Sequence, residues 1–207
     1  MKQLKIVTQL DSMEKGKPGT ADDWLDDCGW ASMAFAANAL TGTTFKSKDG
    51  IAWGEQVGRH DRDGLPDPTS LAQMAKAAPI CGLKATYPKS WGQVLESAKA
   101  GAVIAMNVEQ PKGYPATVQL SAWHKRYAKR HPGTTYGHMV MAAALDGAEA
   151  QFACPTMTGK GPEAYAVPVS WEDLKAIASS KGDAPHKRCL ILVAKSRATA
   201  AKNRANT

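Results

Sequence analysis

The sequence predicts an α+β fold in one domain, with helices first and an antiparallel sheet second. Helical periodicity dominates residues 28–101, and short apolar runs typical of strands follow from residue 102. Asp146-Gly147 separates two of those runs as a hairpin turn would. The chain has 207 residues, enough for one buried core. We expect a single domain over residues 1–195 and a flexible basic tail over residues 196–207, which lacks large apolar side chains.

The first predicted helix begins at Asp27 or Cys28. Its apolar residues recur at helical spacing on one face, and Gly42 is placed to end it. Asp26 or Asp27 can cap its N-terminus, because a side-chain oxygen there accepts from a free backbone N–H. Two further helices are expected after Thr69 or Ser70 and from residue 90 to residue 101.

Strand-like runs follow in the second half of the chain. They are short, apolar and bounded by turn residues, and one more helix with the same apolar periodicity interrupts them. The expected strands cover residues 102–108, 138–145, 148–154 and 188–195, and the helix covers residues 170–179.

Positive charge is concentrated in two stretches, although the whole chain carries only +7. Lys112 to His131 holds five basic residues and no acid, and residues 181–207 hold seven against one acid. Such a surface favours an anionic polymer, either nucleic acid or the bacterial wall, although a merely solvated basic face would look the same. The candidate substrate-binding residues are Lys125, Arg126, Lys129 and Arg130.

The chain shows no targeting or membrane-spanning pattern. No apolar run approaches the roughly 18 residues of a membrane span. The N-terminus turns polar by Thr8, without the apolar core of a signal peptide. We therefore expect synthesis in the cytoplasm without a signal peptide, and no membrane span.

The four cysteines, Cys28, Cys81, Cys154 and Cys189, lie far apart in the sequence. Zinc modules and redox motifs need close pairs, and disulfides need an oxidising compartment. No metal or cofactor is expected, so each cysteine is either a small buried hydrophobe or a reactive thiol.

Cys28 stands out because it begins a helix, where the helix dipole favours a thiolate. A thiol nucleophile needs a base, most often histidine. His138 follows Gly137 and opens a strand, which can aim its imidazole across a cleft. The other four histidines read as loop or solvated residues.

Four motifs, which follow one another in the family's order, resemble the papain-like cysteine peptidases of the double-glycine leader peptidase family. They are Asp27–Met33 with Asn38–Gly42, Gly101–Ala105, Gly137–Val140 with Asp146-Gly147, and Trp171–Leu174. The matches run from about residue 9 to residue 193. The resemblance implies a papain-like fold, with helices packed on an antiparallel sheet, and cysteine peptidase activity.

The resemblance also implies site roles. Cys28 would be the nucleophile, and His138 the general base and later the acid. Gln9 would complete an oxyanion hole with the Cys28 backbone N–H, although it could equally be an ordinary polar residue ending a strand. The family has Asp or Asn before a proline to orient the histidine, and here that position holds Cys154, followed by Pro155.

A neutral thiol is a weak hydrogen-bond acceptor, so Cys154 leaves three alternatives open. The enzyme runs as a Cys–His dyad, Asp146 or Gln151 orients the histidine instead, or the site is degenerate.

Relatives without a transporter occur in bacteriophage lysins and tail-associated wall hydrolases. We therefore expect the protein to cleave bacterial cell-wall peptides in a bacteriophage context. It would be associated with the virion or delivered to the wall. Its expected partners are tail or capsid proteins, and nucleic acid is not expected. The alternatives are a virion structural or anionic-polymer-binding protein on a degenerate fold, and a Cys–His amidase of the wall-hydrolase type. The interval of 110 residues from Cys28 to His138 is longer than amidases of that type usually show.

Overall fold

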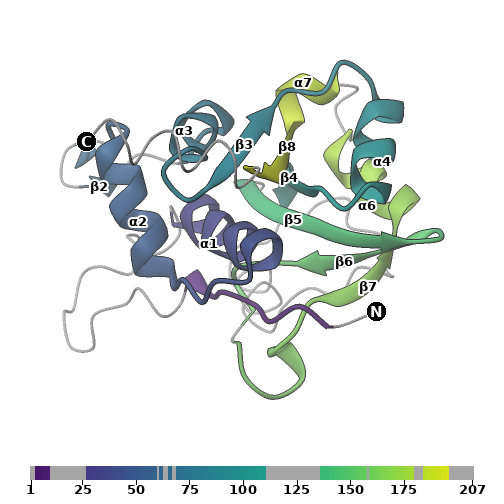
Figure 1. Cartoon of the computed structure of the whole chain (residues 1–207), viewed down its shortest axis with the longest axis horizontal. Helices are drawn as coiled ribbons and strands as arrows, with labels where there is room; N and C mark the ends of the chain where they lie inside the picture. Colours follow the sequence, from purple (N-terminus) through teal and green to yellow (C-terminus); the bar gives the residue numbers. More distant parts are fainter. Residues whose placement is uncertain are drawn as a thin grey trace.

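The computed structural model describes residues 3–9, 27–59, 61–62, 65–66, 69–110, 136–157, 159–179 and 184–195 (Figure 1). The described helices are α1 (Cys28–Thr41), α2 (Ser47–Gln56), α3 (Leu71–Ala77), α4 (Trp91–Lys99), α6 (Trp171–Ala178), α7 (Pro185–Arg188) and the 3₁₀ helix η3 (Gly161–Glu163). The strands are β1 (Asp61–Arg62), β2 (Leu65–Pro66), β3 (Leu83–Thr86), β4 (Val103–Gln110), β5 (Tyr136–Asp146), β6 (Glu149–Ala153), β7 (Val167–Ser170) and β8 (Cys189–Ala194).

Strands β3 to β8 form one six-stranded sheet in the order β3-β8-β4-β5-β6-β7, and every neighbouring pair is antiparallel. The predicted hairpin is confirmed, because β5 and β6 are joined at Asp146-Gly147 and pair Asp146 with Glu149. Strands β1 and β2 form a separate two-stranded hairpin.

The central strands are buried on both faces, because consecutive residues of β4 and β5 are inaccessible to solvent. Helix α1 packs against β4, β5 and β8, and helices α4 and α6 pack against the sheet away from α1 (Figure 1). The expected α+β architecture, with helices on an antiparallel sheet, is confirmed.

Helix α1 is where the sequence predicts it. It begins at Cys28, every residue from Cys28 to Ala37 is buried, and Gly42 ends it in the left-handed conformation at φ 72°. Of the two expected caps, Asp27 is wrong, because its side chain makes no capping hydrogen bond, and Asp26 lies outside the described residues. The Asp27 carboxylate instead pairs with Arg59, with Oδ1 2.7 Å from Nη2.

Helix α2, which the periodicity did not predict, packs against α1, and two of its glycines lie at the contact. A side chain at Gly50 would meet the backbone carbonyl of Trp30, and one at Gly54 would meet the Trp30 indole. Glycine at both positions therefore lets the two helices approach closely. The sequence signal was weak because α2 has few apolar residues and two glycines.

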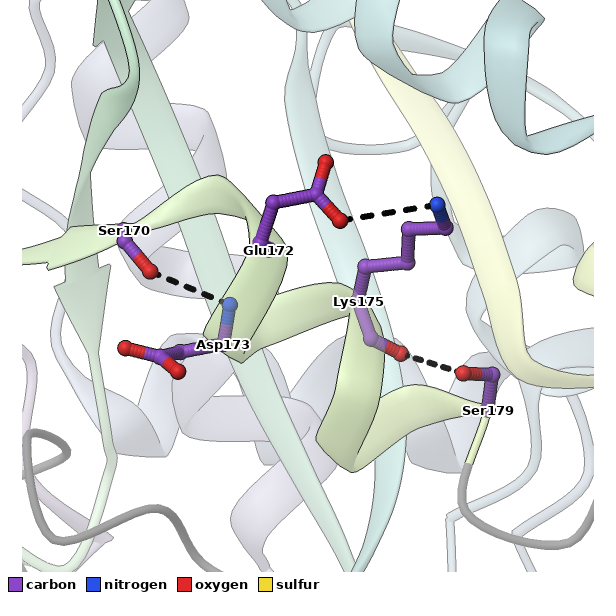
Figure 2. A network of polar contacts seen from close by, with 5 residues as sticks. All are labelled: Ser170, Glu172, Asp173, Lys175 and Ser179. Carbon is purple, nitrogen blue, oxygen red and sulfur yellow. Dashed lines mark hydrogen bonds and ion pairs between the residues drawn. The ribbon is translucent and has the colours of Figure 1, made fainter.

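The later helices begin at serine caps. Ser70 Oγ accepts from the Gln73 N–H, and Ser90 Oγ accepts from the Gln93 N–H, which confirms both predicted starts. In α6, Ser170 Oγ accepts from the Asp173 N–H at 3.1 Å, and Figure 2 shows this cap beside the exposed Glu172–Lys175 ion pair. Strands β3 and β7, with four residues each, were not predicted.

None of the helices among the described residues is long and apolar enough to cross a membrane. The predicted basic tail at residues 196–207 and the basic stretch from Lys112 to His131 lie outside the described residues.

Candidate active site

Cys28 is the first residue of α1, and the residue is 8% exposed. The residue before it, Asp27, forms the ion pair with Arg59, and both side chains are under a tenth exposed. Gly29 fits against the side chain of Thr69, where a Cβ would clash. The helix start that presents the thiol is therefore anchored on two sides.

His138 lies on β5 opposite Val108 of β4, and it is buried, with 3% of its surface exposed. Its Nε2 lies 3.3 Å from the Sγ of Cys154. Cys154 follows the end of β6, so the β5–β6 hairpin brings the two residues together. The side chain that meets this imidazole nitrogen is thus the cysteine that replaces the expected Asp or Asn.

Thr156 continues this chain of contacts, since its Oγ1 lies 3.0 Å from the Cys154 Sγ. Burial raises the pKa of the Cys154 thiol to about 12, although its hydrogen-bond contacts with the Thr156 side chain and backbone oppose the shift. Cys154 is therefore a neutral thiol at any ordinary pH.

Helix α1 and strand β5 are held in register beside the site. Ser32, one turn after Cys28, donates a hydrogen bond from its Oγ to the carbonyl oxygen of Met139, the residue after His138, at 3.4 Å. Cys28 also lies near enough to Cys154 for its charge to raise the pKa of that thiol. Cys28, His138 and Cys154 therefore belong to one cluster.

Gln9 joins the cluster from the N-terminal segment, which comprises residues 3–9. Its backbone N–H donates to the Pro155 carbonyl at 2.8 Å, and the Thr8 hydroxyl donates to the same oxygen at 3.2 Å. Gln9 is 1% exposed. The structure thus places Gln9 next to the residue that follows Cys154, although 19 residues separate it from Cys28 in the sequence.

Neither alternative acceptor for His138 occupies the place of Cys154. Asp146 is exposed and lies eight residues along β5, roughly 25 Å from His138 at the rise of a strand. The Gln151 side chain accepts a hydrogen bond from the Leu4 N–H at 2.8 Å, which ties down the N-terminal segment.

The remaining candidates are not part of this cluster. His186 is exposed on α7. Lys125, Arg126, Lys129 and Arg130 lie outside the described residues, as do the other three histidines.

Burial lowers the pKa of His138 from its ordinary value of 6.5 to about 3. The imidazole is therefore neutral near pH 7, with a lone pair on one of its two ring nitrogens. Burial also raises the pKa of Cys81 to about 11 and that of Cys189 to about 12. Those two thiols belong to the core and lack the conditions for nucleophilic chemistry.

Sequence reasoning missed Arg59 and Thr156. Arg59 sits in a polar run whose sequence gives no sign of a buried partner, and only the fold brings it to Asp27. Thr156 could have been found, because it lies two residues after the recognised Cys154. Among the described residues, no group of three or more His, Cys, Asp or Glu side chains could hold a metal ion.

No family model matches the chain, and no curated protein matches it either. Among solved structures, it is similar to a C39-like peptidase from Bacillus anthracis, with a TM-score of 0.51, 12% identity, and coverage of 95% of this chain and 100% of the other. It also matches the peptidase domain of Streptococcus ComA, a bifunctional ABC transporter of a quorum-sensing pathway, with a TM-score of 0.49, 15% identity, and coverage of 93% and 99%.

The likeness to the Bacillus anthracis protein covers nearly all of both chains and shows that they share a fold. The chain therefore has the papain-like fold of C39-like peptidases, as the sequence motifs predicted.

Proposed function

We propose that the protein is a cysteine peptidase in which Cys28 is the nucleophile and His138 the general base. The observation that carries the proposal is a buried, neutral imidazole on β5, fixed through Nε2 beside the helix start that bears Cys28. Burying an imidazole costs free energy that the fold must offset, and titratable side chains with strongly shifted pKa values gather at functional sites.

The proposed reaction uses these groups in order. As the Cys28 Sγ attacks the carbonyl carbon of the scissile bond, its proton passes to Nδ1 of His138, the ring nitrogen not engaged by Cys154. The backbone N–H of Cys28 and the side-chain amide of Gln9 stabilise the oxyanion. The tetrahedral intermediate collapses to a thioester, and the amine leaves with the proton from His138. Water then attacks the thioester, gives up a proton to His138, and releases the acid and the Cys28 thiol.

A direct test is the rate of Cys28 alkylation by iodoacetamide, followed by mass spectrometry. We expect Cys28 to react faster than the buried thiols Cys81, Cys154 and Cys189, and the His138→Ala variant to lose that advantage. His186→Ala is the matched control, because it removes an exposed histidine and leaves the cluster intact. Equal labelling of Cys28 in wild type and His138→Ala would contradict the proposal.

The finer proposal is that the substrate is a bacterial cell-wall peptide, in a bacteriophage context, held by the basic residues Lys125, Arg126, Lys129 and Arg130. Its support is the excess of positive charge in the sequence between β4 and β5, directly before His138. Purified peptidoglycan incubated with wild type should release new amino termini, and Cys28→Ala should release none. Neutralising the four basic residues should weaken sedimentation with the wall polymer.

A second candidate is a non-catalytic protein on the same fold, in a virion or bound to an anionic polymer. It is favoured by the thiol of Cys154, since a carboxylate or amide would be a stronger acceptor for the imidazole. Slow, His138-independent labelling of Cys28 together with retained wall binding would support it.

A further inference from the structure

The thiol of Cys154 has two polar side chains in reach. His138 Nε2 lies on one side at 3.3 Å and Thr156 Oγ1 on the other at 3.0 Å. All three residues are at most 3% exposed, so bulk water does not compete for these contacts. The donors and acceptors must therefore be shared out within the protein.

A neutral thiol offers one proton, and toward these two neighbouring side chains it can point in two ways. In the first, the Cys154 S–H donates to His138 Nε2, which leaves the imidazole proton on Nδ1. In the second, the S–H donates to Thr156 Oγ1, and the sulfur accepts the N–H of Nε2. The two arrangements give His138 opposite tautomers.

Only the second tautomer suits the proposed chemistry. A base that removes a proton from Cys28 through Nδ1 needs a lone pair there, and the first arrangement fills that position with hydrogen. An Asp or Asn oxygen would enforce the second tautomer by itself. Such an oxygen accepts the N–H of Nε2 and has no hydrogen to donate to that nitrogen. The Cys154 thiol can donate its S–H to Nε2 or accept the N–H of Nε2. For the sulfur to accept, the S–H must point to another acceptor.

We propose that Thr156 is a positioning residue that sets the tautomer of His138, by taking the S–H of Cys154 so that the sulfur accepts from Nε2. This inference rests on the proposed peptidase function. The pair Cys154–Thr156 then does together what a single carboxylate or amide does alone. In this role Thr156 acts on His138 through Cys154.

The test is nitrogen-15 NMR of the imidazole, which distinguishes a protonated from an unprotonated ring nitrogen, recorded near neutral pH. The signals of His138 are assigned by their loss in His138→Gln. Wild type and Thr156→Ser, which keeps the hydroxyl, are expected to carry the proton on Nε2. Thr156→Val keeps the shape but removes the oxygen that competes with Nε2 for the S–H, so the proton should move toward Nδ1.

The same variants are then labelled at Cys28 with iodoacetamide. Thr156→Val should slow the labelling about five- to tenfold, the value of one hydrogen bond, and Thr156→Ser should restore it. In a Cys154→Asn background the same Thr156→Val change should have no effect, because the amide oxygen can accept from Nε2 without help. A merely structural role of Thr156 would not depend on the residue at position 154 in this way.

Two results would overturn the inference: a wild-type protein with its proton on Nδ1, or an unchanged tautomer in Thr156→Val. If Thr156→Val fails to fold, Thr156→Ala removes the same oxygen without adding bulk and is compared instead. The peptidase proposal is judged separately, by whether wild-type Cys28 labelling depends on His138, and the tautomer comparison decides the role of Thr156 in either case.

Discussion

Two regions on the same sheet bury very different side chains. The polar cluster, defined as Gln9, Asp27, His138 and Thr156, lies where the N-terminal segment, α1 and the β5–β6 hairpin meet. The apolar region, defined as Ile104 and Met106 on one face of the sheet and Leu190 and Leu192 on the other, lies on the adjoining strands β4 and β8. Among residues whose burial is described, none of the buried polar ones belongs to β4, β8, α4 or α6.

The difference separates the residues that stabilise the fold from the residues that the fold positions. Apolar burial stabilises the chain, whereas each buried polar group costs free energy unless it is hydrogen-bonded or ion-paired. Each group of the polar cluster relies on a specific partner, so the cluster contributes less to stability than apolar side chains in the same volume would. Its concentration beside Cys28 therefore indicates a functional rather than a structural origin.

The largest effect is expected from breaking the ion pair within the polar cluster. Asp27→Ala leaves the Arg59 guanidinium buried without its carboxylate, which should cost about 3–5 kcal/mol of unfolding free energy. Urea unfolding measures it. Glu96→Ala is the matched control, since it breaks an exposed ion pair with Lys99 and should cost at most about 1 kcal/mol. Equal costs for the two variants would show that the Asp27 pair is solvated.

A truncation in the apolar region tests the other half of the comparison. Ile104→Ala, at a fully buried position, should cost about 2–5 kcal/mol through lost burial and a cavity. In the fraction that remains folded, the rate of Cys28 labelling should be unchanged. A selective loss of labelling with little loss of stability would mean that Ile104 supports the site directly and that the two regions are not separate.

The smallest expected effect is on the pH dependence of stability. Because the pKa of His138 is about 3 in the folded protein and 6.5 ordinarily, the unfolded chain binds a proton between these values that the folded chain does not. This group therefore destabilises the fold as pH falls below 6.5. Between pH 7 and pH 5 the loss from this one residue is about 2 kcal/mol.

Urea unfolding of wild type and His138→Gln at both pH values isolates this contribution, since all other titrating groups are shared. The loss of stability on acidification should be smaller in His138→Gln by that amount. Identical losses would mean that the imidazole is solvated enough to become protonated in the folded state.

Much of the fold was accessible from the sequence because its signals are local. The apolar face of α1 and its terminal Gly42, the serine caps at Ser70 and Ser90, and the turn at Asp146-Gly147 each act within a few residues. Helix α2 escaped prediction because its place in the fold depends on Gly50 and Gly54 fitting against Trp30, a contact between elements. The short strands β3 and β7 likewise depend on their neighbours β8 and β6.

The sequence by itself determined the helix start that carries Cys28, the strand that carries His138 and the unusual residue Cys154, because motif spacing and periodicity are properties of the chain. Only the tertiary structure decided which groups meet. It set Nε2 of His138 against Cys154 rather than near Asp146, backed that thiol with Thr156, and diverted Asp27 from a helix cap to Arg59. Side-chain contacts of this kind follow from how the hairpin, the helix and the N-terminal segment pack, since burial removes water as the competing partner.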